Sequence, residues 1–444
     1  MIPYLSAPQQ IRCLAVRILV VAELYPWPPV DGYRQRLSHM IEGLCQAGEV
    51  ELIALDRHSA SSNRVEPPAV DGLGTVTALT CGPETPMSTW LWPWLRGGPP
   101  RRLRAMDTTG LVDAVLRRLE SDPPIDLIWY SHLDTWWPVQ EALKSRSKTA
   151  APQRQGIPVE IVDFDNLENL SLKLRRTTPP RFAPRSSAID RLKVALRWGI
   201  SRAFDFVDER RWDVVQRQCA DKVTAVVVCS DLDVERSGCS NAQVVGNGAQ
   251  RPVQVLSDRK VLQTATPTML FVGALDYEPN TEAVEWFVSE VLPLITAKMP
   301  AARVRIVGRN PDRVAWVGSE LGVDLIGLVS DLGPELESAD VSIVPIRVGA
   351  GTRLKVVEAL AHSIPLVTTS VGCEGIALRN GVDALIADDA ASFAEACISL
   401  MSDGELRQRL SQAGLQLFTE LYEWSRIEGN LANQARAWVA EAQP

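Results

Sequence analysis

Short runs of apolar residues alternate with stretches of helical periodicity along most of this 444-residue chain. In the first half, the runs that predict strands are 18–22, 51–55, 76–79, 127–130, 159–162, 223–228 and 243–245. In the second half, they are 268–272, 303–307, 323–326, 341–344, 366–368 and 384–386. Helical patterns lie between most of them, for example at 34–46, 110–120 and 205–219. Uniformly apolar strands that alternate with helices are typical of parallel sheets covered on both faces.

Two consecutive sets of such units predict an α/β protein with two Rossmann-like, doubly wound domains that face a central cleft. We place the first domain at 1–250, the second at 251–420 and a helical tail at 421–444, with the joint near 247–260. Ligands of such sheets bind outside the carboxyl ends of the strands. The cleft between the domains is therefore the predicted binding site.

Two stretches of the first domain interrupt the alternation and are predicted insertions. The stretch 83–104 is rich in Pro, Trp and Arg, and 171–202 carries nine Lys or Arg residues with one acid. Within the second, apolar residues recur at helical spacing among basic ones, at Ile189, Leu192, Leu196 and Ile200. A basic amphipathic helix in an acidic protein fits an anionic membrane surface, and a solvated insertion is the alternative. The tryptophans of the first stretch fit the same surface or a sugar-stacking wall, with core packing as the commoner explanation.

The composition narrows the class of protein. A formal net charge of −8 argues against a general nucleic-acid binder, because the phosphate backbone favours basic surfaces. The eight cysteines are scattered without a C-x-x-C pair, so we expect reduced core cysteines, no zinc site and a cytoplasmic protein. No segment approaches 18 uncharged apolar residues, which argues against a transmembrane helix.

The most informative motif is the run 349–360, which follows a strand-like run and opens a helix-like one. Its two glycines let backbone N–H groups approach a ligand, and a helix N-terminus attracts anions. Arg353 and Lys355 fall in the first turn, where the helix dipole disfavours cations unless an anion accompanies them. Glu358 follows about 9 Å beyond Thr352, a reach that suits the ribose of a diphosphate bound there. The run predicts a nucleotide-sugar cradle, and the alternative is a surface ion pair between Lys355 and Glu358.

Further motifs around this run resemble the donor-binding domain of the retaining group 1 glycosyltransferases, also called glycosyltransferase family 4, which have the GT-B fold. The resemblance covers 268 to about 403. Its motifs, in chain order, are 271–276, 305–308, 327–331, 338–341, 349–360, 363–369 and 372–376. Several ordered motifs at family-like spacing are more specific than one glycine motif alone.

The rest of the chain resembles the same family more loosely. Asp31, Gly32 and Arg34 resemble the loop after the first strand, which in the family lies near the donor phosphates. His132, after the strand at 127–130, resembles the family histidine at the reacting sugar. The helical tail resembles the C-terminal helix that in the family crosses back to pack on the first domain.

The resemblance implies a role for each matching residue. Glu358 would hold the ribose hydroxyls, and Glu358 and His132 are the predicted catalytic residues. The base would be framed by the backbone of Leu328 and Val329. The diphosphate would be held by Gly351, Thr352, Arg353, Lys355 and Gly273.

The chain departs from the family pattern at two places. Many members carry a glutamate eight residues before the one that matches Glu358, where it contacts the transferred sugar, and this chain has Ala350. The Arg and Lys that often follow the first donor-domain strand are replaced by 276–280. We infer that Arg353 and Lys355 supply the charge for the phosphates, and the contacts to the donor sugar stay open.

Sugar transfer requires stabilisation of the leaving diphosphate, which cations and helix N–H groups supply without a metal ion. We therefore expect no metal and no other cofactor, with a nucleoside diphosphate sugar as donor substrate. The triplet 163–165, Asp-Phe-Asp, is of a kind that holds a divalent ion in the other major glycosyltransferase architecture. Here it ends a first-domain strand, and strand capping or acceptor contact is the preferred interpretation. Glu374 either caps a helix at Gly375 or touches the sugar.

Together these features predict a metal-independent hexosyltransferase. It would move a hexose-type sugar from a nucleotide diphosphate sugar to a saccharide or lipid-linked acceptor, with retention, in polysaccharide or glycoconjugate biosynthesis. His132 would hydrogen-bond the donor sugar, and a purely structural histidine is the alternative. Residues 171–202 would contact an anionic membrane peripherally. The rival functions are a sugar-nucleotide epimerase on the same fold and a non-catalytic nucleotide-sugar-binding protein.

Overall fold

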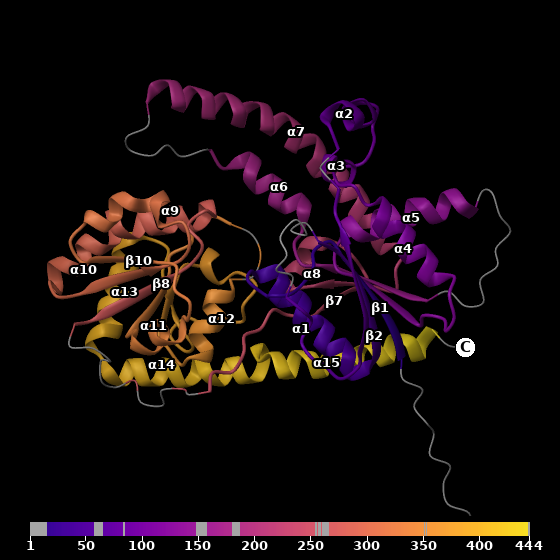
Figure 1. Ribbon diagram of the computed structural model, residues 1–444. Coiled ribbons are helices and arrows are strands. Elements are labelled where there is room, and N and C mark those ends of the chain that lie inside the picture. Colours follow the sequence, from indigo (N-terminus) through magenta and orange to yellow (C-terminus); the bar gives the residue numbers. More distant parts are fainter. Residues whose placement is uncertain are drawn as a thin grey trace, which may run out of the picture.

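A computed structural model describes residues 16–56, 65–82, 85–147, 158–179, 187–253, 255, 259, 266–349, 351 and 353–442. Figure 1 shows two α/β units side by side, with the last helices of the chain following one another beneath them. The two predicted Rossmann-like domains are therefore confirmed as the fold class.

Seven parallel strands form the first sheet, in the order β3-β2-β1-β4-β5-β6-β7. Their bounds are β1 Val16–Ala22, β2 Gly48–Asp56, β3 Leu73–Thr80, β4 Leu127–Tyr130, β5 Val159–Phe164, β6 Ala225–Val228 and β7 Ala242–Val244. In the central strand, Val21 pairs with Ile53 of β2 on one side and with Tyr130 of β4 on the other. The strand order reverses between β1 and β4, so the loops after these strands lie where such sheets bind ligands.

Helices cover both faces of this sheet because successive side chains of a buried strand point to opposite faces. Ile18 and Val20 of β1 pack in one cluster with the helices at 32–47 and 424–442, whereas Leu19 and Val21 pack in another with the helices at 109–119, 133–147 and 188–220. The helices of this half of the chain are α1 Gly32–Ala47, α2 Met87–Leu95, α3 Arg101–Ala105, α4 Thr109–Leu119, α5 Leu133–Ser147, α6 Glu168–Thr177, α7 Ala188–Ala220 and α8 Asp231–Ser237.

Six parallel strands form the second sheet, in the order β10-β9-β8-β11-β12-β13. They are β8 Thr268–Val272, β9 Arg303–Val307, β10 Val323–Gly327, β11 Val341–Val344, β12 Leu366–Thr368 and β13 Leu385–Ile386. The helices around them are α9 Glu278–Trp286, α10 Leu292–Lys298, α11 Gly333–Ser338, α12 Leu354–Ala361, α13 Ala390–Ser402 and α14 Gly404–Leu417. Short helical turns of 3-10 or π type lie at η1 Phe287–Val291, η2 Pro311–Ser319, η3 Val371–Cys373 and η4 Phe418–Tyr422. One buried cluster joins this sheet to its helices.

The C-terminal helix α15, Trp424–Ala442, returns to the first domain, as the resemblance predicted (Figure 1). Its start meets the linker between the sheets, where Ala249 N donates to Tyr422 O at 2.9 Å and Trp424 N donates to Ala249 O at 3.2 Å. Farther along, α15 packs on α1, where His39 stacks on Trp424 and its Nδ1 lies 2.7 Å from Glu428 Oε1. The helix therefore fastens the second domain to the first.

Each predicted strand overlaps a strand of the structure, but the two insertions contain helices that the pattern alone did not define. The stretch 83–104 holds α2 and α3, although α2 contains Pro93. Tertiary contacts hold it in place: Trp94 Nε1 donates to Asp208 Oδ1 of α7 at 2.6 Å, and Arg101 Nε donates to Asp208 Oδ2 at 2.6 Å. The stretch 171–202 forms most of α6 and the start of α7, which continues unbroken into the helix predicted at 205–219.

Candidate functional site

The glycine loop between β11 and α12 has the geometry of a ligand-binding loop. The helix begins at Leu354, and Arg353 is its N-cap residue, without a side-chain capping bond. Gly349 and Gly351 have φ values of +148° and +83°, a region that favours glycine. The buried guanidinium of Arg353 lies where a side chain on Gly349 would be. Thr352, a predicted phosphate contact, and Ala350, where the family pattern has a glutamate and the sugar contact stays open, lie outside the described residues.

Lys355 lies in the first turn of α12 and is partly buried. Its Nζ donates to Asn280 Oδ1 at 2.7 Å and lies 4.4 Å from the centre of the Phe271 ring. Burial, and secondarily Arg353, lower the pKa of Lys355 to about 7. A β-carbon on Gly273 would lie 2.8 Å from Lys355 Nζ, so the glycine after β8 leaves room for the ammonium.

Asn280 is a site residue that sequence analysis did not identify. It lies on α9, is buried, and its Nδ2 donates to Ala274 O at 2.8 Å while its Oδ1 accepts from Lys355. The available signal was its place in the stretch 276–280, which replaces the basic residues of the family pattern. An amide that accepts from Lys355 holds the ammonium in place without neutralising it.

Glu358 follows Lys355 on α12 and is partly buried. Burial raises the pKa of its carboxyl group, and Lys355 opposes that shift. Within the described part of the chain no ion pair joins Lys355 to Glu358; the ammonium is bonded to Asn280, and Glu358 acts on it only through longer-range attraction. The alternative interpretation, a surface ion pair between Lys355 and Glu358, is therefore wrong.

Leu328 and Val329 follow β10 at the edge of the second sheet. Gly327, with φ of +82°, turns the chain there. The Leu328 side chain is 77% exposed, and Val329 packs partly against the core of the second domain. The backbone of Leu328 and Val329 therefore lies directly after a strand end. Its contact with the base of the nucleotide stays a prediction.

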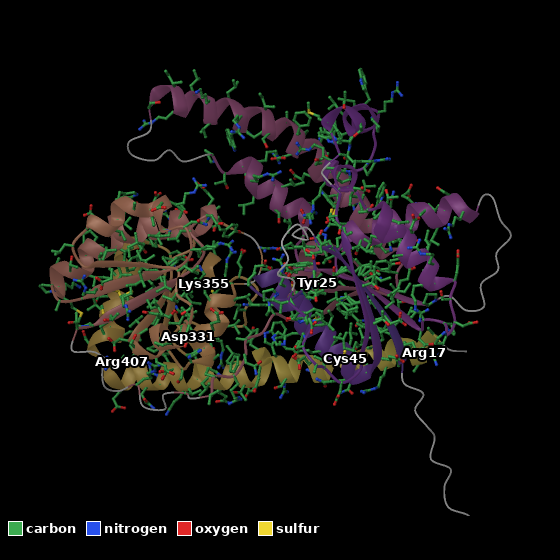
Figure 2. The ribbon with its side chains drawn as sticks, in the orientation of Figure 1. Arg17, Tyr25, Cys45, Asp331, Lys355 and Arg407 are labelled. Atoms are coloured by element: carbon green, nitrogen blue, oxygen red, sulfur yellow. The ribbon has the colours of Figure 1, made fainter. Side chains whose placement is uncertain are left out.

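Two loops of the first domain meet the glycine loop and α12. A β-carbon on Gly32 would lie 3.3 Å from Leu354 Cδ1, and one on Gly351 would lie 2.9 Å from Asn166 Oδ1. Figure 2 marks Lys355 and Tyr25 on the sides of the two domains that face each other. The loops after β1 and β5 therefore lie beside the start of α12, where the sequence predicts the diphosphate.

Asp31 and Arg34 of the first-domain loop bond to each other. Asp31 is the N-cap of α1: its Oδ1 accepts from Arg34 N at 2.9 Å, and its Oδ2 pairs with the Arg34 guanidinium. Arg34 Nε also donates to Tyr25 O at 3.1 Å. These bonds fix the path of the chain into Gly32, and contact of either side chain with a ligand stays a prediction.

His132 lies directly after β4 and is buried. Its Nδ1 is 2.6 Å from Asp134 Oδ2, and its Nε2 is 3.5 Å from Glu168 Oε1 at the start of α6. Burial lowers the pKa of His132, but Asp134 outweighs that effect and raises the pKa to about 9. At neutral pH the ring is therefore protonated on both nitrogens and donates hydrogen bonds, which suits a sugar contact better than a general base.

Arg102, in the first insertion, joins the same cluster. Its NH2 lies 2.7 Å from Asp134 Oδ2, and its NH1 lies 2.7 Å from Glu168 Oε1. Glu23, His132 and Asp134 are close enough to hold a metal ion, but Arg102 already brings a positive charge to that place. Sequence analysis missed Arg102, Asp134 and Glu168. The one local signal was the His-x-Asp spacing, which puts Asp134 in the first turn of α5, where a carboxylate is favoured.

The Asp-Phe-Asp triplet is tied to a buried arginine. Arg36 of α1 donates from Nε to Asp163 Oδ2 at 2.9 Å and from NH2 to Asp163 Oδ1 at 2.8 Å. Its NH1 donates to Val245 O at 2.9 Å and to Asn247 Oδ1 at 3.0 Å, in the linker. Asp163 therefore holds the linker to the first domain through Arg36, which supports a structural role for the triplet over a metal site.

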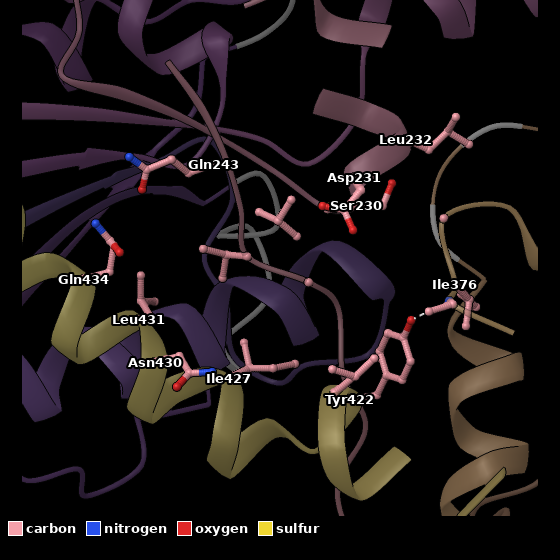
Figure 3. A pocket seen from close by; sticks show the side chains of 17 residues that line it. Ser230, Asp231, Leu232, Gln243, Ile376, Tyr422, Ile427, Asn430, Leu431 and Gln434 are labelled. Atoms are coloured by element: carbon pink, nitrogen blue, oxygen red, sulfur yellow. Dashed lines mark hydrogen bonds between the residues drawn. The ribbon is translucent and has the colours of Figure 1, made fainter. Parts of the chain in front are cut away.

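A separate pocket of about 540 Å³ lies between the domains on the linker side (Figure 3). It is lined by the ends of β6 and β7, by Gly375–Ala377 and by α15, and none of the predicted nucleotide contacts lines it. Tyr422 Oη accepts from Ala377 N there at 2.7 Å.

Glu374, near this pocket, bonds across the domains: its Oε1 lies 2.9 Å from Arg236 NH2 of α8. No helix begins at Gly375, so the predicted cap is wrong, and Glu374 instead joins the domains.

Part of the second domain matches a known family model. The family model described as glycosyl transferases group 1 matches residues 266–403. The phosphatidyl-myo-inositol mannosyltransferase of Mycobacterium leprae is 28% identical over 233 residues, which cover 49% of this chain and 60% of that protein. The chain spans less than two thirds of the length of the curated relatives it matches.

Solved structures share the whole architecture. The sucrose-phosphate synthase of Thermosynechococcus elongatus aligns with a TM-score of 0.65 at 16% identity, covering 96% of this chain and 100% of that one. The HepE protein of Anabaena, solved in complex with UDP, aligns with a TM-score of 0.57 at 11% identity, covering 95% and 100%. The chain therefore has the two-domain GT-B fold, and its segment 266–403 matches the family model of the group 1 glycosyl transferases.

Proposed function

We propose that this chain is a glycosyltransferase that moves a hexose-type sugar from a nucleoside diphosphate sugar to a saccharide or lipid-linked acceptor. The observation that carries the proposal is the placement of Lys355. Its ammonium lies in the first turn of α12, bonded to Asn280 and under the electrostatic influence of Arg353. The start of that helix and the glycine loop before it lie against the first-domain loops, through Leu354 beside Gly32 and Gly351 beside Asn166. Lys355 and Arg353 therefore bring two cationic groups to a helix N-terminus, where the lowered pKa of Lys355 means that its charged form is disfavoured. A bound anion would stabilise that charged form.

The proposed chemistry follows from that charge. As the sugar–phosphate bond breaks, negative charge grows on the diphosphate, and preorganised cations and helix N–H groups stabilise it. Lys355, Arg353 and the backbone near Gly351 would supply this stabilisation without a metal ion. For retention, the acceptor hydroxyl would approach on the leaving-group side and give its proton to the diphosphate, while His132 donates a hydrogen bond to the sugar.

Two observations support a nucleotide sugar as the donor: one concerns the site, and the other concerns a protein of the same fold. Glu358 offers a carboxylate about one turn into α12, where it would accept from both ribose hydroxyls. HepE has been solved with UDP and with UDP-glucose. We propose a nucleotide sugar of the same general class for this chain.

We further propose that the protein binds its acceptor at an anionic membrane and that the first half of α7 contacts this membrane. Its apolar residues are 55–70% exposed and lie on one stripe, at Ile189, Leu192, Leu196 and Ile200. Exposed cations flank the stripe at Arg191, Lys193, Arg197 and Arg202. Trp92 of α2 is a further exposed apolar side chain, and α2 is fastened to α7 through Trp94 and Asp208, beyond the stripe. Among the described residues, no helix combines the length and apolarity needed to span a bilayer.

The anionic membrane fits this surface better than a second copy of the chain. Two copies packed stripe to stripe would bring their basic flanks together, and like charges at such an interface oppose association. Anionic headgroups would pair with the same cations while the stripe enters the acyl boundary. The whole surface is therefore chemically matched to lipid.

The experiment that tests the donor site is a thermal-shift panel of nucleotide sugars on the wild type and on Glu358→Ala. Binding at 100 times the dissociation constant should add about 2.7 kcal/mol of stability. We expect a shift with one donor, lost in Glu358→Ala and kept in Glu395→Ala, an exposed acid of the same domain. No shift with any nucleotide sugar would overturn the proposal.

Assays with the responding donor then separate the rival functions. Sugar transfer that depends on an added acceptor supports a transferase. Conversion of the donor into another nucleotide sugar without acceptor would indicate an epimerase. Binding with neither transfer nor slow hydrolysis would indicate a binding protein.

A further inference from the structure

Glu168 is a carboxylate at the site to which no role has been given. It is the first residue of α6, and its side chain is partly buried. Its Oε1 lies 2.7 Å from Arg102 NH1 and 3.5 Å from His132 Nε2. Both contacts use the same oxygen, and within the described part of the chain Oε2 makes no hydrogen bond. Oε2 therefore keeps its capacity to accept.

The position of Glu168 relative to the second domain follows from its loop. Asn166 precedes it by two residues, and Asn166 Oδ1 would lie 2.9 Å from a β-carbon on Gly351. The β5–α6 connection therefore touches the glycine loop that precedes α12. A sugar attached to a diphosphate at α12 would lie next to this connection.

The imidazole of His132 is held so that one nitrogen faces Glu168. Nδ1 is taken by Asp134, which Arg102 also holds, so the ring cannot turn without breaking a 2.6 Å contact. The N–H at Nε2 is then directed toward the region beside Glu168 Oε1. The distance between Nε2 and Oε1, 3.5 Å, is longer than that of a good hydrogen bond. A donor and an acceptor placed side by side match a hydroxyl group, which both accepts and donates.

We propose that Glu168 binds a hydroxyl of the transferred sugar, as the hydrogen-bond acceptor beside the donor His132. The inference rests on the proposed function, since it assumes that the sugar of a nucleotide donor enters the site. Glu168 selects for the hydroxyl-bearing part of the donor, because its negative charge would repel the phosphates. The phosphates remain with Lys355 and Arg353 across the domain boundary.

The competing explanation is that Glu168 only anchors Arg102 and thereby α6. The chain offers a matched control for it. Glu209 of α7 accepts from Arg176 Nε of α6 at 3.0 Å, so Glu209→Gln also removes a Glu–Arg ion pair that fastens α6. Glu209 is not among the groups around His132. An anchoring effect should appear in both variants, and a sugar contact only in Glu168→Gln.

The test compares wild type, Glu168→Gln and Glu209→Gln by calorimetry with a nucleotide sugar and with its nucleoside diphosphate alone, and by kcat and KM. The glutamine keeps an oxygen for Arg102 NH1, and melting temperatures check the fold. In Glu168→Gln, we expect nucleoside diphosphate affinity within twofold of wild type. We expect nucleotide-sugar affinity and kcat/KM to fall about tenfold or more, because a charged hydrogen bond is lost. Glu209→Gln should match wild type in all of these.

Three outcomes would overturn the inference, and they differ from failure of the proposed function. The first is nucleotide-sugar affinity and kcat/KM in Glu168→Gln within twofold of wild type. The second is an equal loss of affinity for the sugar nucleotide and the bare diphosphate. The third is the same loss in Glu209→Gln. If the wild type binds no nucleotide sugar at all, the proposed function fails, and this inference fails with it.

Discussion

Lys355 and Asn280 join the starts of α12 and α9 through a hydrogen bond of 2.7 Å from Nζ to Oδ1. Asn280 is neutral, so the bond orients the ammonium without neutralising it, and Glu358 offsets its charge only in part. Burial, with help from Arg353, lowers the pKa of Lys355 to about 7. A diphosphate bound there would raise that pKa, and binding would then take up a proton at neutral pH.

Nucleoside diphosphate affinity should therefore weaken as the pH rises above 7. Between the pKa of Lys355 in the free protein, about 7, and its higher value in the complex, the dissociation constant should rise up to about tenfold per pH unit. Calorimetry from pH 7 to 9 in buffers of different ionisation enthalpy measures both the affinity and the proton uptake. Lys355→Met should remove this dependence, and Lys298→Met, at an exposed ion pair, should keep it. A flat pH profile in the wild type would contradict the assignment.

Asn280→Asp should weaken nucleotide binding through charge. A carboxylate in this position would pair with Lys355, raise its pKa and repel the incoming diphosphate. We expect the dissociation constant to increase about tenfold or more, which is about 1.4 kcal/mol or more. Asn280→Ala loses the same hydrogen bond without adding a charge and should have a smaller effect. Equal losses in both variants would show that the bond, and not the charge, matters.

The sequence revealed the parts of the site that lie close together along the chain. Gly351, Arg353, Lys355 and Glu358 occupy one loop and one helix start, so local spacing alone brought them together. Their roles as ligand contacts remain predictions. The alternation of apolar runs likewise predicted every strand, because burial on both faces leaves a clear pattern.

The parts that sequence analysis missed depend on contacts between distant elements. Glu168 lies beside His132 because β4 and β5 are neighbours in the sheet. Arg102 reaches them from α3, which Arg101 fastens to Asp205 and Asp208 of α7. A single sequence does not show either relationship. The helix α2 contains Pro93 and forms because Trp94 reaches Asp208 on α7. Tertiary contacts there override a weak local preference.

Arg36→Met should destabilise the fold strongly. Arg36 is buried and makes two bonds to Asp163 and further bonds to the linker, so the change would leave Asp163 buried and unpaired. Breaking such a buried pair costs about 3–5 kcal/mol. Urea unfolding measures the loss. Arg146→Met, which breaks an exposed pair with Glu120, is the control and should change stability by less than about 1 kcal/mol. Equal effects of the two variants would refute a structural role for Arg36.

Sugar transfer should be insensitive to chelators. The Asp-Phe-Asp triplet is of a kind that holds a divalent ion in another glycosyltransferase architecture, but Arg36 occupies both oxygens of Asp163. Glu23, His132 and Asp134 also lie close enough to hold an ion, but Arg102 already bonds to Glu23 and Asp134. We expect the rate of transfer to be the same, within twofold, with and without excess EDTA. Loss of activity in EDTA that Mg²⁺ or Mn²⁺ restores would show that a metal takes part.

Replacing Leu192 and Leu196 together by Glu should release the protein from anionic membranes. Both side chains are more than 60% exposed on the apolar stripe of α7, so the change should leave the fold intact. Burying a leucine contributes about 1.5–3 kcal/mol, and an added acid is repelled by anionic lipid, so vesicle affinity should fall at least tenfold. Sedimentation with vesicles of an anionic and a neutral phospholipid measures it, and wild-type binding should weaken as salt increases. Leu321→Glu, at an 85% exposed leucine of the second domain, should bind as the wild type does. If the double variant also binds unchanged, α7 is not the membrane contact, while the donor site at Lys355 stands on its own evidence.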